Sequence, residues 1–242
     1  MNVSGSNSAS INVGYWNIHG YTSKVIGQKV TDRELLDVIG DCDVIGIGEI
    51  QSSNKINIEG YISIDQKIRD KTTKGPKISR GIGVFVKKEI SHLVEPIPND
   101  NEDSIWVRLK PEFTKYSESI YLGTFYVSLA NKNNKSYDFL KSANEEIYKF
   151  INKGAVLIQG DFNARKASEK DFAEFFEEDP ILGGGGESQV NRNSEDKNKN
   201  PRGEELLDLC KSNNLLIANG RKPGDLFGKY TCHNWNGSSV VD

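Results

Sequence analysis

Two polar residues, Asp161 and Asn163, lie shortly after an apolar run and offer a carboxylate and a carboxamide two positions apart. The run, residues 155–158, is typical of a strand buried on both faces, and Gly160 breaks it. Because side chains alternate along an extended chain, residues two apart point to the same side. Such a pair could orient or deprotonate water and donate a hydrogen bond to a substrate oxygen. The alternative is an Asx-type turn, in which both side chains only cap the backbone.

The same arrangement recurs at two earlier strands. Residues 11–16 form a β-type apolar stretch that ends at Asn17, and residues 44–48 form another that ends at Glu49. If these strands share a sheet and a direction with residues 155–158, their polar ends meet at one edge. Gathered strand ends are where sites form in layered α/β architectures. We therefore predict a site at this edge, whereas three unrelated loop residues would require three coincidences.

Length and composition describe an ordinary globular chain. It has 242 residues, of which 36% are hydrophobic and 27% charged, and no Pro/Ser-rich linker divides it, so one large domain is expected. No apolar run approaches the roughly 18 residues of a membrane span, so no membrane partner is expected. The polar segment 1–10 lacks the features of a signal peptide and is predicted to be a disordered tail. Three distant cysteines indicate reduced thiols and an intracellular setting.

The charge excludes one class of nucleic-acid binder. A formal net charge of −3 argues against a protein that coats nucleic acid non-specifically. A nuclease is still compatible, since local patches and a bound metal can supply positive charge. Lys71, Lys74, Lys77 and Arg80 form one such local cluster, although a solvated loop has the same pattern.

Hydrophobic periodicity predicts an alternation of helices and strands. Residues 81–86, 104–109 and 119–127 are expected to be antiparallel neighbours, because their connections are short and polar. Helices are predicted at residues 31–39, 137–151 and 204–210, and further strands at residues 61–64, 215–218 and 230–235.

Seven segments, in order, resemble the endonuclease/exonuclease/phosphatase superfamily, the group of pancreatic deoxyribonuclease and the abasic-site repair endonucleases. Within it, the chain is most similar to the endonuclease domain of LINE-type (non-LTR) retrotransposons, over residues 11–242. Each segment alone is a weak signal, but seven in the family's order are specific. They are WNIHG (16–20), GIGEIQ (46–51), SRGIGVFV (79–86), GTFYVS (123–128), GDFNAR (160–165), RGEELLDLCKSNNLLIANG (202–220) and TCHNWNGSSVVD (231–242).

The resemblance implies an α/β fold, a two-layer mixed β-sandwich flanked by helices. It also implies a site that binds Mg²⁺, with Mn²⁺ as the alternative ion. Glu49 matches the metal-binding carboxylate, and Asn17 the residue that helps to position metal and phosphate. Asp161 matches the carboxylate that orients or activates the attacking water, and Asn163 the amide that stabilises the transition state. Tyr126 aligns with an aromatic residue that hydrogen-bonds the scissile phosphate.

Further roles follow from the same resemblance. Arg80 and Thr231 correspond to substrate-binding positions, and Asp242 to the residue that orients a catalytic histidine. The family continues into a Ser-Asp-His motif, whereas this chain stops at Asp242, and none of its three histidines occupies that place. We therefore expect a truncated domain that lacks its last strands and has impaired activity. His19, within the first segment, is interpreted as a structural or surface residue.

The expected function is Mg²⁺-dependent nicking of DNA, which in a retroelement primes reverse transcription in the nucleus. One alternative is a phosphatase of the same superfamily that acts on a lipid or inositol phosphate ester. Another is a catalytically dead relic that only binds its substrate. The segment at residues 202–220 favours the retroelement branch.

Overall fold

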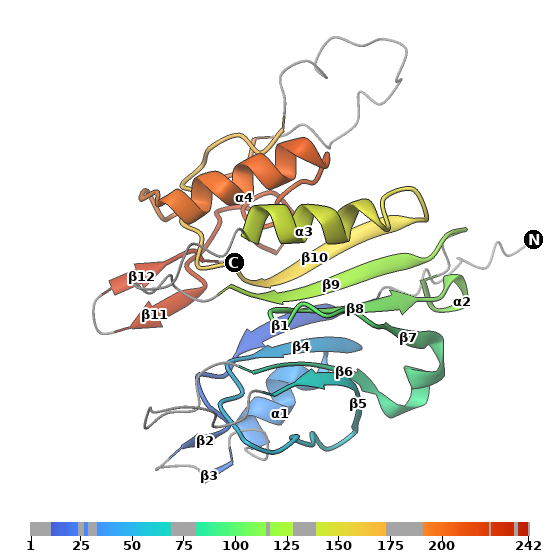
Figure 1. Ribbon diagram of the computed structural model, residues 1–242. Helices are drawn as coiled ribbons and strands as arrows, with labels where there is room; N and C mark the ends of the chain where they lie inside the picture. Colours follow the sequence, from blue (N-terminus) through green and yellow to red (C-terminus); the bar gives the residue numbers. More distant parts are fainter. Residues whose placement is uncertain are drawn as a thin grey trace, which may run out of the picture. The chain divides into compact units, whose positions relative to one another are not determined.

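The computed structural model describes residues 11–23, 27–28, 33–68, 81–114, 117–127, 139–172, 191–222, 224–234 and 237–241. The chain divides into two compact units, which are described separately (Figure 1). Unit 1 comprises Met1–Tyr126 and Lys149–Gly160, and unit 2 comprises Val127–Tyr148 and Asp161–Asp242. The predicted tail at residues 1–10 and the basic cluster at residues 71–80 lie outside the described residues.

Unit 1 contains a mixed four-stranded sheet in the order β1-β4-β6-β5. β1 is parallel to β4, whereas β6 is antiparallel to both β4 and β5. All five residues of β4 are buried, as expected for a continuous apolar strand at the centre of a sheet. The strands are β1 (Val13–Asn17), β4 (Val44–Gly48), β5 (Tyr61–Lys67) and β6 (Ile82–Lys87).

Helix α1 (Arg33–Gly40) connects β1 to β4 and packs on this sheet. Its Ile39 joins Ile45, Ile47 and Phe85 in one buried cluster. The hydroxyl of Tyr61 donates to the carbonyls of Ile39 (2.6 Å) and Cys42 (2.7 Å), which ties the end of the helix to β5. A short hairpin of β2 (Thr22–Ser23) and β3 (Gly27–Gln28) lies between β1 and α1 in the sequence.

A second four-stranded sheet of the same unit has the order β10-β9-β8-β7. β8 is antiparallel to both β7 and β9. On one face of this sheet, Trp106 packs against Phe125 and Phe150, with ring centroids 5.8 and 4.8 Å apart. The strands are β7 (Val94–Ile97), β8 (Ser104–Leu109), β9 (Ile120–Tyr126) and β10 (Ala155–Asp161). A short helix, η2 (Lys88–Leu93), precedes β7, and another, α2 (Pro111–Thr114), follows β8.

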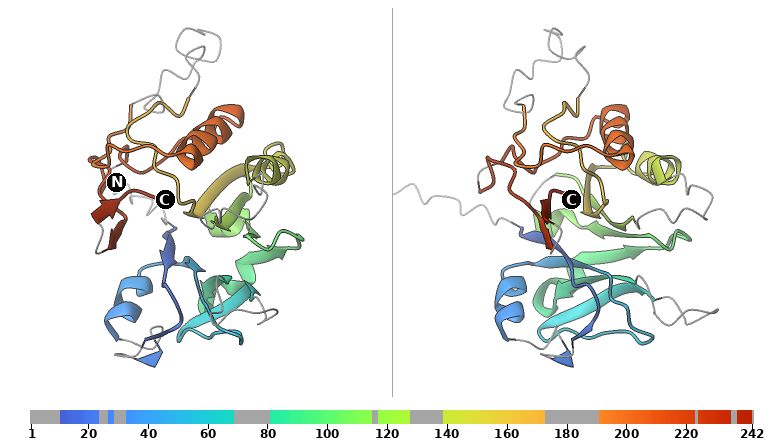
Figure 2. Two further views of the ribbon diagram at one scale, coloured as in Figure 1. Left: turned by 60° about the vertical axis from the view of Figure 1, so that its left-hand side comes forward. Right: turned by 90° about the vertical axis from the view of Figure 1, so that its left-hand side faces the viewer.

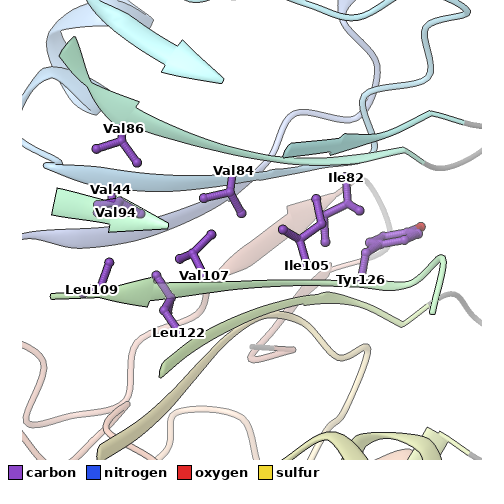
Figure 3. Packing of buried hydrophobic residues seen from close by; sticks show 10 residues of the cluster. All are labelled: Val44, Ile82, Val84, Val86, Val94, Ile105, Val107, Leu109, Leu122 and Tyr126. Atoms are coloured by element: carbon purple, nitrogen blue, oxygen red, sulfur yellow. The ribbon is translucent and has the colours of Figure 1, made fainter. Parts of the chain in front are cut away.

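The two sheets enclose an apolar cluster (Figure 3). Side chains of β4 and β6 meet side chains of β7, β8 and β9, and the removal of this apolar surface from water stabilises the sandwich. The predicted α/β fold with two packed sheets and flanking helices is thereby confirmed. The cluster consists of Val44, Ile82, Val84, Val86, Val94, Ile105, Val107, Leu109, Leu122 and Tyr126.

Unit 2 contains α3 (Phe139–Tyr148), α4 (Pro201–Ser212) and a hairpin of β11 (Cys232–Asn234) and β12 (Gly237–Ser239). The two helices lie side by side (Figures 1 and 2), and the Nδ2 of Asn213 donates to Oδ1 of Asn144 at 2.6 Å. Helix α4 begins three residues before its predicted start. The reason is local, since Asn200 caps the helix through the backbone N–H of Gly203 and Pro201 follows at a position that favours helix initiation.

Two predicted strand arrangements are wrong. β8 and β9 are antiparallel neighbours as predicted, but β6 pairs with β4 and β5 in the first sheet. The chain passes to the second sheet only after β6, through η2 to β7. β10 belongs to the second sheet and does not share one with β1 and β4. Apolar runs of this length specify burial but not a pairing partner.

The strand predicted at residues 215–218 is also absent. This segment has no ladder, and the N–H of Ile217 donates to Oδ2 of Asp171 at 2.6 Å. The carbonyl of Ile217 accepts from Nη1 of Arg221 at 2.7 Å. Side chains therefore satisfy the backbone groups that a strand would have used. Among the described residues, no helix combines the length and the apolar character that crossing a membrane requires.

Candidate active site

The ends of three strands of unit 1 converge on Glu49. β1 and β4 run parallel, so Asn17, which ends β1, lies at the same edge as Glu49, which follows β4. Tyr126 ends β9 of the other sheet. Oε1 of Glu49 accepts hydrogen bonds from Nδ2 of Asn17 (3.1 Å) and from the hydroxyl of Tyr126 (2.8 Å). The structure thus brings together three residues that the sequence analysis placed in one site.

Two further side chains bind the second oxygen of Glu49. Oε2 lies 2.8 Å from Nδ1 of His19 and accepts a hydrogen bond of 3.1 Å from Nε2 of Gln51. A carboxylate has about four lone-pair positions, two on each oxygen. In the described part of the chain, the carboxylate therefore has four partners, two on each oxygen. We call Asn17, His19, Glu49, Gln51 and Tyr126 the Glu49 cluster.

The backbone of the Glu49 cluster adopts an unusual conformation. His19, Glu49 and Gln51 have φ angles of 47°, 51° and 48°, in the left-handed region that non-glycine residues seldom occupy. Main-chain contacts hold these turns, because the N–H of His19 donates to Oδ1 of Asn17 (2.9 Å) and that of Gly20 to the carbonyl of Glu49 (2.8 Å). Strain of this kind concentrates at functional sites.

The surroundings keep Glu49 ionised. Burial alone would raise the pKa of this carboxyl, but hydrogen bonds from Asn17, Tyr126 and His19 outweigh it and hold the pKa below the ordinary value. The side chain of Glu49 is 15% exposed, whereas that of His19 is 86% exposed. The site thus combines a largely buried carboxylate with an imidazole, that of His19, that is exposed to solvent.

The carboxylate of Glu49 has the chemistry that a hard divalent cation requires. Mg²⁺ prefers oxygen ligands and retains several waters, so a single carboxylate together with a substrate phosphate suffices. Asn17 directs its amide nitrogen to Glu49 and its oxygen to the N–H of His19, so in this structure it orients the carboxylate. Within the described part of the chain, no group of three or more His, Cys, Asp or Glu residues is arranged to hold a metal.

In unit 2, Asp161 and Asn163 form a turn. Oδ1 of Asp161 accepts the N–H of Asn163 at 2.9 Å, and Asn163 has a φ of 50°. Nδ2 of Asn163 donates to the carbonyl of Val127 at 2.9 Å. The extended geometry that would point both side chains the same way is therefore not formed. The Asx-type turn describes this segment, because local hydrogen bonds compete with an extended chain.

The segment before Asp242 contacts this turn. The carbonyl of Val241 accepts from the N–H groups of Phe162 (3.2 Å) and Ala164 (3.4 Å). The N–H of Val241 donates to Oγ1 of Thr231 at 3.2 Å. Thr231 is therefore linked through Val241 to the turn that carries Asp161 and Asn163. Arg80 and Asp242 lie outside the described residues.

The sequence analysis assigned no site role to two members of the Glu49 cluster, His19 and Gln51. A signal for both was present in the spacing. Each lies two residues after a polar strand end, His19 after Asn17 and Gln51 after Glu49. The left-handed backbone that turns them toward the carboxylate is not visible in a pattern of apolar and polar residues.

Among the comparisons with known proteins, matches to this chain were found among solved structures. Neither a protein-family model nor a curated protein matches this chain. Solved structures that match include an endonuclease/exonuclease/phosphatase family protein from Leptotrichia buccalis, with 15% identity, a TM-score of 0.44 and coverage of 64% of this chain and 67% of that chain. An AP endonuclease from Archaeoglobus fulgidus has 14% identity, a TM-score of 0.35 and coverage of 67% and 60%.

A third solved structure is the inositol polyphosphate 5-phosphatase domain of SpSynaptojanin in complex with inositol (1,4)-bisphosphate and calcium ion. It has 13% identity and a TM-score of 0.29, and the match covers 71% of this chain and 56% of that chain. The matches to the Archaeoglobus fulgidus and SpSynaptojanin structures thus span less than two thirds of those chains.

Proposed function

We propose that this chain hydrolyses phosphodiester bonds in DNA with the help of Mg²⁺. The observation that carries the proposal is the convergence of β1, β4 and β9 on one ionised carboxylate that is 15% exposed. Such a carboxylate, with its charge fixed by surrounding donors, suits the binding of a cation beside a phosphate. The family resemblance of the seven sequence segments points to the same chemistry.

Each residue of the Glu49 cluster has a distinct part in this proposal. Glu49 would hold the cation, and the cation would supply charge neutralisation at the phosphate. Asn17 and Tyr126 fix the orientation of Oε1 through their hydrogen bonds. These bonds help to lower the pKa of Glu49, so the carboxylate stays ionised at neutral pH.

The residues of unit 2 contribute through the turn at the end of β10. Asp161 is buried, and we assign it to the orientation or activation of the attacking water. Asn163 is assigned to donate to the phosphate in the transition state, which requires Nδ2 to exchange the carbonyl of Val127 for a phosphate oxygen. Substrate binding by Arg80 and Thr231, and the orienting role of Asp242, rest on the resemblance alone.

The proposal also names a substrate, DNA, in preference to a lipid or inositol phosphate. The segment at residues 202–220 resembles the LINE-type branch, for which the substrate is DNA and the nick in the nucleus primes reverse transcription. A phosphatase would use the same carboxylate and cation on a lipid or inositol phosphate. The choice between these substrates is therefore made by experiment.

The test compares two substrates with matched variants. Nicking of supercoiled plasmid is measured with Mg²⁺, with Mn²⁺ and with EDTA, next to phosphate release from an inositol phosphate and from its lipid. We expect metal-dependent nicking that falls by about 10²-fold or more in Glu49→Gln and Asp161→Asn. The exposed residues Glu89 and Asp208 provide the controls Glu89→Gln and Asp208→Asn. Phosphate release without nicking would identify a phosphatase, and DNA binding without either product a protein that only binds.

A further inference from the structure

Among the described residues, each oxygen of Glu49 has two hydrogen-bond partners, the number of its lone-pair positions. The partners of Oε2 are Nδ1 of His19 at 2.8 Å and Nε2 of Gln51 at 3.1 Å, while Asn17 and Tyr126 use the first oxygen. A cation that binds this carboxylate must therefore replace one of four hydrogen-bond partners.

The partners differ in how easily they can leave. Tyr126 is 7% exposed and belongs to the core cluster between the sheets, so its hydroxyl cannot move without disturbing packing. Asn17 and Gln51 are half-buried. The side chain of His19, in contrast, is 86% exposed, so its imidazole can rotate into water with little loss of buried surface.

The backbone contacts of His19 do not depend on the position of its ring. Its N–H donates to Oδ1 of Asn17, and the N–H of the next residue, Gly20, donates to the carbonyl of Glu49. These bonds keep the loop in place while the ring rotates. The imidazole is thus a movable group on a fixed loop.

We infer that His19 competes with the metal ion for Oε2 of Glu49 and is displaced when the cation binds. This inference rests on the proposed function, because it concerns the same cation site. His19 acts as a positioning residue that holds the carboxylate while the cation is absent. The ring lies close to Oε2, so the ring in this position and a cation on Oε2 exclude each other by volume.

An alternative arrangement, in which His19 is itself a metal ligand, predicts the opposite change in metal affinity. If Nε2 of His19 were a metal ligand, with Nδ1 held by Glu49 as a carboxylate often holds a ligating histidine, removal of the ring would weaken binding. If the ring is a competitor, its removal frees Oε2 and strengthens binding. The sign of the change in affinity therefore decides between them.

The experiment measures the affinity for Mn²⁺ by calorimetry and by water-proton relaxation, in the absence of substrate. The parent is compared with His19→Ala and His19→Gly, of which the glycine variant also removes the strain of the left-handed φ. Exposed His92 provides the control His92→Ala. We expect both His19 variants to bind Mn²⁺ about two- to fivefold more tightly than the parent, the range of an exposed polar pair.

Weaker or unchanged binding in both His19 variants overturns the inference. A second measurement follows the imidazole resonances of the parent by NMR during a Mg²⁺ titration. The resonances of His19 should change position with added Mg²⁺ until the site is saturated, whereas those of His92 should not change. Unchanged His19 resonances at saturating Mg²⁺ would also overturn the inference. If Glu49→Gln titrates like the parent, the cation site itself is absent and the proposed function fails, which is a different result.

Discussion

At the scale of single residues, the Glu49 cluster sets the charge of one carboxylate through its hydrogen bonds. Burial pushes the pKa of Glu49 upward, and donors from Asn17, Tyr126 and His19 pull it below its ordinary value. The tyrosine is the donor that comes from the opposite sheet. Its hydroxyl therefore couples the packing of the sandwich to the charge state of the site.

Tyr126→Phe tests this coupling. The variant removes one donor to Oε1 and keeps the ring in the core, so the pKa of Glu49 should rise toward its ordinary value. A carboxylate with a higher pKa is protonated earlier as the pH falls, so the acid side of the nicking profile should move to higher pH. A carbon-13 NMR titration of Glu49 checks the shift directly. Tyr148→Phe, at a tyrosine that is 71% exposed, is the control, and equal titrations in both variants would refute the role of the hydroxyl.

At the scale of elements, the end of β10 depends on a close approach to β9. Gly160 has a φ of 148°, and a Cβ at this position would lie 2.0 Å from the carbonyl oxygen of Phe125. Only glycine permits this approach, because any side chain would force the two strands apart. The glycine lies directly before Asp161, so the approach fixes where the strand ends and the polar turn begins.

Gly160→Ala should therefore destabilise the sandwich of unit 1 by about 2–4 kcal/mol, measured as the free energy of unfolding in urea. Gly60→Ala is a matched control, because Gly60 also has a positive φ (80°) but no atom within 4 Å of the added Cβ. The control should lose only about 1 kcal/mol, the cost of the conformation itself. Equal losses in the two variants would show that the contact with Phe125 is unimportant.

The elements also show what the sequence could and could not predict. The buried strand β4 and the helices α3 and α4 were predictable, because apolar spacing and capping residues are local signals. The sheet to which β10 belongs was not, because partner choice depends on contacts far away in the sequence. The same holds for the site. Residue type and spacing identified Asn17 and Glu49, but His19 required knowledge of a left-handed backbone.

At the scale of the whole molecule, each unit has its own buried feature. Unit 1 has the apolar sandwich, whereas unit 2 contains a buried ion pair between Asp171 and Arg221. The side chains of this pair are 0% and 2% exposed and make bonds of 2.7 and 2.9 Å. Burial opposes ionisation of Asp171, but Arg221 and the N–H of Ile217 outweigh it, so the pKa of Asp171 is lowered.

This lowered pKa predicts acid-sensitive stability in unit 2. A carboxyl whose pKa is lower in the folded state contributes stability above its unfolded value of about 3.9, and loses it as the pH falls through the folded value. Asp171→Asn should cost about 3–5 kcal/mol at pH 7, because it leaves Arg221 buried without its charge partner, and should flatten the acid dependence. Urea unfolding between pH 7 and acid checks both effects. Glu169→Gln, in an exposed pair with Lys199, should change stability by under about 1 kcal/mol.

A buried thiol, that of Cys210, allows the opening of unit 2 to be measured separately from that of unit 1. Cys210 on α4 is 3% exposed, and burial raises its pKa to about 12, so its reactive thiolate is scarce in the folded protein at neutral pH. In a Cys42→Ser/Cys232→Ser background, labelling of Cys210 by a thiol reagent should follow the opening of this unit. Asp171→Asn should then accelerate labelling by about 10²-fold or more if labelling follows the opening equilibrium, since each 1.4 kcal/mol is a factor of ten. Gly160→Ala, in the other unit, serves as the comparison. Rapid labelling of the parent would mean that Cys210 is accessible, and equal acceleration by both variants would mean that the two units open together.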